Sequence, residues 1–396
     1  MKIIFLISFY IVSIFAADNV AAGKKFQDSE KCKACHLPIV NEWKESWHAK
    51  SHYKNDEYFR KTIDYVQRKT RRSLNSVKVQ CASCHNPRIS VTDTGIDYEI
   101  DSVMGLDKGS EVNQALSSDS ISEGINCVVC HNIDKIHTDA DESIRGINRV
   151  EWTKSGVMSG PYEDSKSPYH KVEHRDFMDT KTDQLCFVCH ANDKSVSGFV
   201  FTNMQSEYKK NDKSCVDCHM GKREKGIAAT LRDHKGKRKQ RDVRRHRFEG
   251  AHTSYMWIDA LKLNLSKSKN DILIEIQNPQ PHNIPSGFGS RELVIEVVFK
   301  SKGKTLKTKE LSLTRHYTSK RKKPTVPHLA VKQSKDMSIK AKGKKTLKVP
   351  NVDGSDSAEV SIYYVLVNEE IRSLLKLEEE RWSKRHLIVI DTIKLK

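Results

Sequence analysis

The sequence Cys32-Lys-Ala-Cys35-His36 begins a pattern that recurs through the first half of the chain. Two cysteines are separated by two residues, and a histidine follows the second cysteine directly. The pattern occurs four more times, as Cys81-Ala-Ser-Cys84-His85, Cys127-Val-Val-Cys130-His131, Cys186-Phe-Val-Cys189-His190 and Cys215-Val-Asp-Cys218-His219. These five copies contain all ten cysteines of the 396-residue chain.

This motif is the attachment sequence of c-type haem. The two thiols form thioethers with the cofactor, and the adjacent histidine binds the iron from one side. Zinc ribbons and disulfide frameworks also use paired cysteines, but neither requires a histidine after the second one. The sequence therefore predicts five covalently bound haem c groups. The ten cysteines are the expected attachment points, and the expected proximal iron ligands are His36, His85, His131, His190 and His219.

The chain also has twelve histidines outside the motifs. Iron in an electron-transfer haem takes a second side-chain ligand, usually His or Met, and this large pool favours bis-His ligation. The expected distal ligands are His48, His170, His246, His252 and His282. Three others stay open as alternatives, namely His52, His137 and His174. His234 is expected to be solvated, and three further residues are expected to be structural or exposed, namely His316, His328 and His386.

The N-terminus has the form of a secretory signal. Met1-Lys2 is followed by an apolar stretch over residues 3–15 and then by small residues such as Ala16 and Ala17. We predict a signal peptide over residues 1–22, with the cleavage site open and an uncleaved anchor helix as the alternative. The expected location is the periplasm, the cell exterior or the outer cell surface. Thiols are not protected from oxidation there, so the cysteines must be occupied.

Residues 23–254 are expected to form one pentahaem domain, mostly α-helical and irregular. Because haem replaces much of an apolar core, we expect short helices, such as 183–190 and 211–220, and no regular sheet before about residue 250.

Residues 255–396 lack cysteine and show strand patterns, for example the alternation Ile272-Leu-Ile-Glu-Ile276. They predict an all-β, sandwich-like domain with one helix at 368–383. The expected strands cover 257–265, 271–278, 292–300, 304–313, 335–340, 344–349, 358–367 and 386–395. The expected roles of this domain are to cap the last haem through His282 and to dock a partner; a purely structural role stays equally open.

The net charge of +18 lies mainly in two segments. Residues 209–247 contain 15 Lys/Arg against 5 Asp/Glu, and residues 300–348 contain 17 against 2. Such a charge alone suggests an anionic partner such as nucleic acid. Export argues against nucleic acid, and haem propionates offset part of the charge. The remaining interpretations are a solvated surface, an acidic redox partner or an anionic surface.

The pattern resembles the multihaem c-type cytochromes related to the tetrahaem cytochrome of ammonia-oxidising bacteria. Four segments are similar to distal-ligand segments of that family and of its larger relatives with a C-terminal β domain. They are Trp43-x-x-Ser46-x-His48-Ala49, Ser167-Pro-Tyr-His170, His246-Arg-Phe-x-Gly250-x-His252 and His282-x-x-Pro285-Ser-Gly287. Because this chain has five motifs, the pairing of ligands cannot be copied from a four-haem relative.

Together these features predict an electron carrier, in which closely spaced bis-His haems pass electrons to or from a redox partner protein or a membrane quinol oxidase. Self-association into a longer haem chain is a variant of this hypothesis. The alternative is a multihaem oxidoreductase acting on a small nitrogen or sulfur compound at one open haem. Multihaem nitrite reductases often replace one motif histidine by lysine, whereas all five motifs here keep histidine, which favours the carrier and leaves catalytic residues unassigned.

Overall fold

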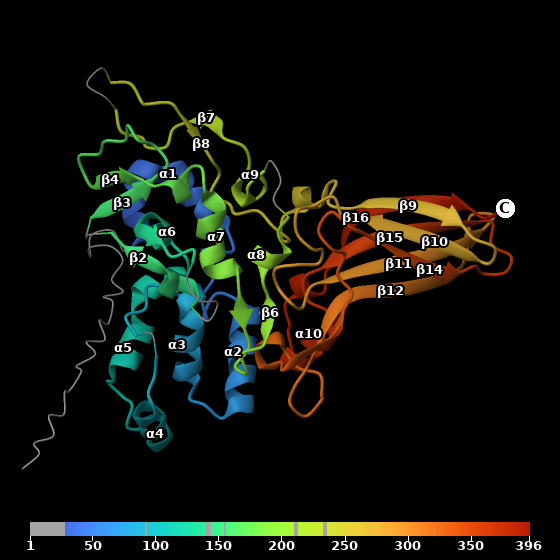
Figure 1. The fold of residues 1–396 in the computed structure, drawn as a ribbon, viewed down its shortest axis with the longest axis horizontal. Helices are drawn as coiled ribbons and strands as arrows, with labels where there is room; N and C mark the ends of the chain where they lie inside the picture. Colours follow the sequence, from blue (N-terminus) through green and yellow to red (C-terminus); the bar gives the residue numbers. More distant parts are fainter. Residues whose placement is uncertain (1–27, 92, 140–143, 154–155, 210–212, 233–235) are drawn as a thin grey trace, which may run out of the picture.

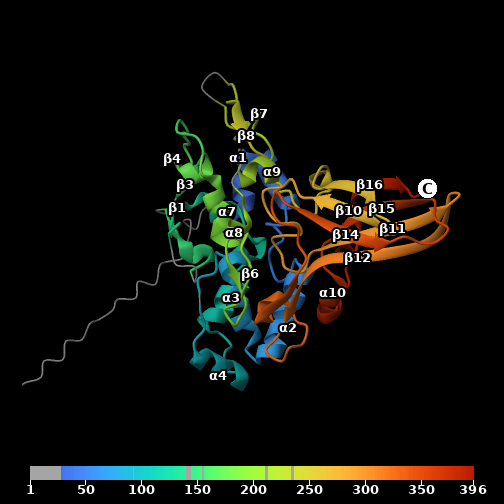
Figure 2. The same cartoon turned by 45° about the vertical axis from the view of Figure 1, so that its right-hand side comes forward.

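The computed structural model describes residues 28–396 except 92, 140–143, 154–155, 210–212 and 233–235. The predicted signal peptide therefore lies outside the described residues. The helices gather at one end of the molecule and the long strands at the other (Figure 1). Turning the molecule shows the same division into two parts that meet along α2, β6 and α10 (Figure 2). Within the described residues, no helix is long and apolar enough to cross a membrane.

The helical part is built from short helices that carry the five motifs. Its helices are α1 Ser29–Glu45, α2 Glu57–Thr70, α3 Leu74–His85, α4 Ile96–Met104, α5 Glu111–Ser117, α6 Cys127–His131, α7 Thr182–His190, α8 Met204–Glu207 and α9 Cys215–His219. Short 3-10 helices lie at Asp119–Glu123, Gly146–Arg149 and Asp176–Met178. The expectation of a helix from 183 to 190 is confirmed, whereas the one at 211–220 is shorter than expected.

Each motif lies on a helical turn. In α3, α6, α7 and α9 the motif histidine is the last helical residue, and in α1 the helix is broken at His36 (φ −114°, ψ 34°), two residues before Pro38. Residues i, i+3 and i+4 share one face of a helix, so both cysteines and the histidine point to the same side. The helix ends directly after the motif, which leaves that side open.

The helical part also contains four two-stranded ladders, which corrects the expectation of no sheet before residue 250. They pair β1 Ile133–Ile136 with β2 Val150–Trp152, β3 Val157–Gly160 with β4 Lys171–His174, β5 Asp193–Lys194 with β6 Val200–Thr202, and β7 Glu224–Gly226 with β8 Arg241–Val243. Each strand has two to four residues, too few to give a visible alternation in the sequence. The ladders fix the ends of the long loops between motifs.

The C-terminal part consists of two antiparallel sheets, as predicted. One has the order β14-β10-β9 and the other β13-β12-β11-β15-β16. The strands are β9 Lys262–Lys267, β10 Asp271–Gln277, β11 Glu292–Ser301, β12 Lys304–Thr318, β13 Lys332–Asp336, β14 Lys344–Pro350, β15 Ser357–Val365 and β16 His386–Lys394. Alternate residues such as Ile272, Ile274 and Ile295 are fully buried and form the core between the sheets.

Three predicted elements of this part differ from the structure. The strand expected at 335–340 is β13, which ends at Asp336. The first strand begins at Lys262, because Ser254–Trp257 form a 3-10 turn instead. The helix expected at 368–383 is only α10 Glu369–Leu375, followed by a separate 3-10 turn at Glu380–Trp382. Lys376 ends α10 in a left-handed conformation (φ 54°), which stops the helix after two turns.

A buried carboxylate joins the two parts. Glu57, at the first turn of α2, is 3% exposed and accepts hydrogen bonds from the backbone N–H of Glu378 (2.8 Å), that of Glu379 (3.0 Å) and the indole N–H of Trp382 (2.6 Å). Beside it, the ring of Tyr58 packs edge-on against Phe288. The apolar residues of α2 belong to the same core cluster as the sandwich. The helical part and the sandwich therefore share one continuous core.

We expect Glu57→Ala to lower the free energy of unfolding by at least about 2 kcal/mol, because three buried donors lose a charged acceptor. Glu378→Ala is the matched control, since it keeps the backbone donor and removes only an exposed ion pair with Lys61. That control should change stability by less than about 1 kcal/mol. Denaturant unfolding of the haem-loaded protein measures both, and equal losses would contradict the role given to Glu57.

Candidate functional site

The structure places four motif histidines opposite four histidines from distant segments. The ring centroids are 6.4–6.5 Å apart in every case, for His36 with His170, His48 with His190, His131 with His246, and His219 with His282. Two histidines that bind one metal from opposite sides need two metal–nitrogen bonds of about 2 Å between their rings. The observed separation leaves room for this and is too long for direct ring stacking. The four pairs therefore fit an iron held between two imidazoles.

Backbone carbonyls orient most of these rings. The Nδ1 atom lies 2.6 Å from the carbonyl oxygen of Ala228 in His36, 2.8 Å from that of Ser159 in His131, and 2.5 Å from that of Glu249 in His219. A carbonyl only accepts, so Nδ1 must donate, which leaves the lone pair on Nε2. His246 and His282 make the same kind of bond, to Arg244 (3.0 Å) and Asn283 (2.9 Å).

Burial lowers the pKa of several of the paired rings. Desolvation is the largest cause that lowers the pKa of His48 to about 3 and of His246 to about 4, and the opposing histidine is the next. Burial also lowers the pKa of His131 and of His282. Metal binding requires the neutral imidazole, so these residues are in the form that binds iron.

The fifth motif histidine has different surroundings. The Nδ1 of His85 lies 2.9 Å from the hydroxyl of Ser51, and the ring of Phe59 stacks flat on it, with centroids 4.0 Å apart. Within the part of the chain that the structure describes, no histidine faces His85 as in the four pairs. The candidate for a histidine near His85 is His328. Burial is the largest cause that lowers the pKa of His85, and the charge of His328 is the second.

His328 was expected to be structural or exposed, and the structure instead places it beside the second motif. It lies in the 3-10 turn Pro327–Leu329, with its ring edge-on to Phe201 at 4.9 Å, and its buried Nδ1 has no hydrogen-bond partner. Its backbone carbonyl accepts from the N–H of Val196. No sequence pattern around His328 predicts this position, because the turn comes close to the helical part only when the sandwich packs against it.

The structure does not place His252 as predicted. Its ring stacks on Trp47 with centroids 4.0 Å apart and meets Trp382 edge-on. Burial, followed by the positive charges of Arg291 and Arg381, lowers its pKa to about 2. The prediction that it is a distal ligand has no support in this geometry, because the turn after His246 directs His252 into the junction with the sandwich.

The three histidines left open as alternatives also lie elsewhere. His137 contacts Glu151 at 2.8 Å, His174 lies 3.7 Å from Asp179, and His52 accepts a hydrogen bond from the N–H of Lys54. Among the described residues, none of the three faces a motif histidine.

Cysteines of different motifs lie against one another. Cys127 lies close enough to Cys32 to raise the pKa of the Cys32 thiol, and Cys84 and Cys186 raise the pKa of Cys189 and Cys215 in the same way. Cys130 is close enough to Cys186 for its thiol to be influenced electrostatically. These contacts join the motifs in the order first, third, fourth and fifth, with the second beside the fourth. None of the ten cysteines forms a disulfide.

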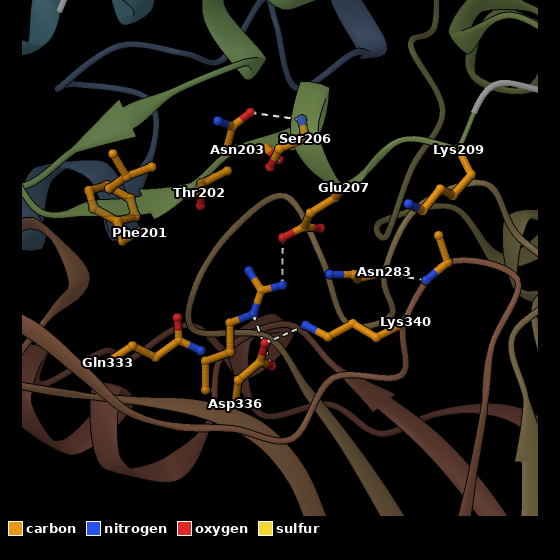
Figure 3. Close-up of a pocket in the computed structure, with 13 residues that line it drawn as sticks. Phe201, Thr202, Asn203, Ser206, Glu207, Lys209, Asn283, Gln333, Asp336 and Lys340 are labelled. Atoms are coloured by element: carbon orange, nitrogen blue, oxygen red, sulfur yellow. Dashed lines mark hydrogen bonds and ion pairs between the residues drawn. The ribbon is translucent and has the colours of Figure 1, made fainter. Parts of the chain in front are cut away.

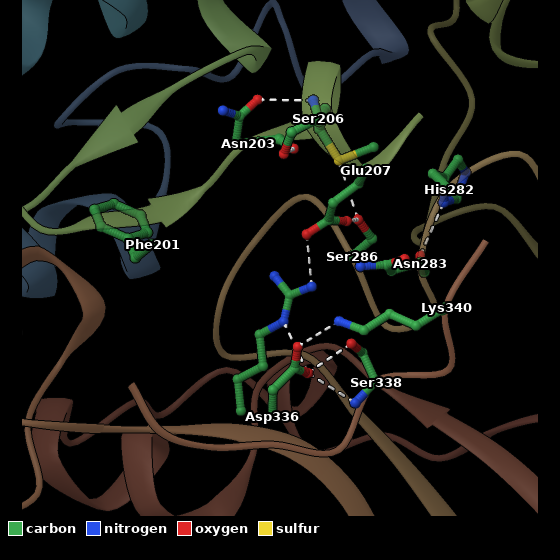
Figure 4. A network of polar contacts seen from close by, with 12 residues as sticks. Phe201, Asn203, Ser206, Glu207, His282, Asn283, Ser286, Asp336, Ser338 and Lys340 are labelled. Carbon is green, nitrogen blue, oxygen red and sulfur yellow. Dashed lines mark hydrogen bonds and ion pairs between the residues drawn. The ribbon is translucent and has the colours of Figure 1, made fainter. Parts of the chain in front are cut away.

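A polar network holds the loop that carries His282. Glu207, at the end of α8, accepts from Ser286 and pairs with the buried guanidinium of Arg315 on β12 at 2.7 Å (Figure 4). Asp336 on β13 pairs with the other side of that guanidinium. The network ties the last helix before the fifth motif to the sandwich. It therefore fixes the distal side of the fifth site.

A cavity of about 610 Å³ adjoins this network (Figure 3). Its walls come from β6, α8 and the sandwich, and they include Phe201, Glu207, Lys209 and Asn283. No residue of the five motifs lines it. The cavity is thus separate from the attachment sites.

Comparison with known proteins agrees with this geometry. The sequence model described as "Cytochrome c554 and c-prime" matches residues 31–132, which contain the first three motifs. A penta-heme cytochrome c552 from Thermochromatium tepidum has the same fold, with a TM-score of 0.69 at 17% identity, over 96% of this chain and 100% of that one. The chain therefore resembles the multihaem c-type cytochromes in the segment that carries its first three motifs and in its fold. Its motif cysteines bind haem c covalently.

Other comparisons add nothing to this assignment. A superoxide reductase and a protein from Arabidopsis thaliana match 35% and 34% of the chain with TM-scores of 0.18 and 0.17, too low to bear on the fold. No curated protein matches significantly.

His246 and His252 provide a direct test of the ligand assignment, because they lie on the same loop and were both predicted as ligands. We expect His246→Ala to convert one low-spin haem to high spin, and His252→Ala to leave the low-spin count unchanged. Electron paramagnetic resonance and visible spectra of the ferric protein measure this. A high-spin haem in the His252 variant, with none in the His246 variant, would reverse the assignment.

Proposed function

We propose that this cytochrome is an exported pentahaem electron carrier, in which bis-His haems pass electrons to or from a redox partner. The observation that carries the proposal is the close approach of cysteines from different motifs, which links all five motifs. Since each cysteine bonds to the edge of its haem, contacting cysteines bring neighbouring cofactors close together. The signal-like sequence of residues 1–22 supports export.

The role of the protein residues is to hold, orient and bury the cofactors. When bound, haem c supplies one-electron chemistry at its iron. The four histidine pairs would occupy both axial positions at their sites, and carbonyls such as those of Ala228 and Ser159 keep the rings in place. Such saturated sites leave no position for a substrate, which suits transfer of electrons rather than bond chemistry.

Haem quantitation tests this proposal. We expect five haems per chain by pyridine haemochrome analysis, and four low-spin haems that a reductive titration reduces in overlapping steps. Fewer than five haems would contradict the motif assignment. Five haems that exchange electrons only very slowly with one another would contradict the carrier function.

The surroundings of His85 favour a second candidate function, an oxidoreductase acting on a small nitrogen or sulfur compound. Ser51 and Phe59 hold His85 from its own side, and in the described structure no histidine ring faces it as in the other sites. One axial position at the second motif would then be open. The residue that we assign to act on a bound molecule is His328, which is buried, has no hydrogen-bond partner at Nδ1 and influences the pKa of His85 electrostatically.

Binding of small ligands distinguishes the two functions. We expect the ferric wild-type protein to show one high-spin haem that shifts to low spin with nitric oxide or nitrite. His328→Ala should change the affinity of that haem at least threefold and leave the four low-spin signals unaltered. A protein with five low-spin haems and no ligand binding would exclude the oxidoreductase.

A further inference from the structure

The face of the molecule around the first attachment site is covered by a basic segment. We name residues 222–232 and 236–247 the basic strap. It contains eleven Lys/Arg against two Asp/Glu. Its two strands, β7 and β8, project beside α1 and α9 (Figure 1). The strap is far from the equally basic strands of the sandwich, which lie at the other end of the molecule.

The strap is directly bonded to the first site. Its Ala228 carbonyl accepts from Nδ1 of His36, and the N–H of Thr230 donates to the carbonyl of Cys35 at 2.7 Å. On the distal side, Tyr162 donates to the carbonyl of Asp242, and Asp164 pairs with Arg241 at 2.7 Å. The strap therefore holds both the motif and the segment that leads to His170.

The strap also continues into the third site. Its last residues include His246, whose ring faces that of His131. The backbone N–H of His246 donates to the carboxylate of Glu42 in α1. The cysteine contact between Cys32 and Cys127 joins the same two sites. A protein bound on the strap would thus lie beside the end of the chain of sites.

Part of the positive charge of the strap is not neutralised within the molecule. Arg223, Lys225, Arg244 and others have acidic partners. Among the described residues, no ion pair is formed by three exposed side chains of the strap, namely Lys222, Arg232 and Arg238. Tyr169, which precedes His170 of the first site in the chain, is 55% exposed, so this end of the chain of sites reaches the surface.

We propose that the basic strap is the docking surface for an acidic electron-transfer protein, and that electrons enter or leave through the first site. The inference rests on the proposed carrier function. Opposite charges steer two proteins into a productive encounter and raise the association rate by a factor of about 10 to 1,000 at low salt. Positive charge beside the first site directs an acidic partner to that site. Positive charge on the sandwich would direct the partner to the opposite end of the molecule.

Charge reversal in two places tests the proposal. The strap variant is Lys222→Glu with Arg232→Glu and Arg238→Glu. The matched control is Lys304→Glu with Lys307→Glu and Lys348→Glu, three exposed residues of the sandwich that form no ion pair among the described residues. Both variants change the net charge by the same amount. A difference between their reaction rates therefore shows that the position of the charge on the surface matters. Haem content and low-spin signals of both are measured first, to show that the sites are intact.

The redox probes are a small monohaem cytochrome c with its native lysines and the same protein after succinylation, which makes it acidic. By stopped flow at low ionic strength, we expect the strap variant to react with the acidic probe at least about tenfold more slowly than wild type. The control variant should lose less than threefold. The difference should vanish at high salt, where the charges are screened within a few ångströms.

Each other outcome overturns the proposal. Equal losses in both variants would mean that net charge alone acts, and no loss in the strap variant would mean that docking occurs elsewhere. Loss of binding to anionic phosphatidylglycerol vesicles, with the probe rate unchanged, would assign the strap to a membrane surface. If intact wild-type protein exchanges electrons with neither probe, the carrier function itself fails; if exchange is fast but insensitive to the strap, only the docking inference fails.

Discussion

The opposition of two imidazole rings, with centroids 6.4–6.5 Å apart, is the constraint on which the rest of the structure depends. A motif can place its own histidine, because one helical turn aligns it with the two cysteines. The second ring must come from another segment and must be held with its Nε2 facing inward. Carbonyls such as that of Asn283, which accepts from Nδ1 of the distal His282, meet this need without a charged group that would compete for the iron. Irregular segments supply most of these carbonyls, and the short strand β3 supplies that of Ser159.

This constraint also explains why the helical part and the sandwich share one core. The fifth site takes its second histidine, His282, from the loop after β10, so the sandwich must be fixed firmly against α8. Two kinds of contact do this. The buried Glu57 binds the turn at Trp382, and Glu207 binds Arg315 beside the His282 loop. A charged pair as buried as Glu207 and Arg315 is costly unless it is well bonded, and Ser286 and Asp336 complete its bonding.

The sequence predicts those features that depend on residues close together in the chain. It leaves open those that depend on contacts between distant segments. The attachment motifs, the strands and most strand boundaries follow from short-range patterns, and the sandwich was predicted from alternation such as that of Ile272 to Ile276. The choice between His246 and His252 could not be made in this way, because both follow basic or small residues in one irregular loop. It depends on Trp47 and Trp382, which surround His252 and belong to segments far away in the chain. For the same reason, the position of His328 beside His85 had no local signal.

The order of the sites is compatible with the proposed combination of four sites held by two histidines and one site with an open position. The cysteine contacts form a path through the first, third, fourth and fifth motifs, and the second motif touches this path only where Cys84 meets Cys189. Electrons can then pass along the path without using the second site. That site is thus free to differ, and it does differ, because Ser51 and Phe59 replace the surroundings that the other motif histidines have. A branch that joins the path at its middle can receive electrons from either end. A site that performs chemistry needs such a supply of electrons. In a protein that only carries electrons, the same branch does no harm.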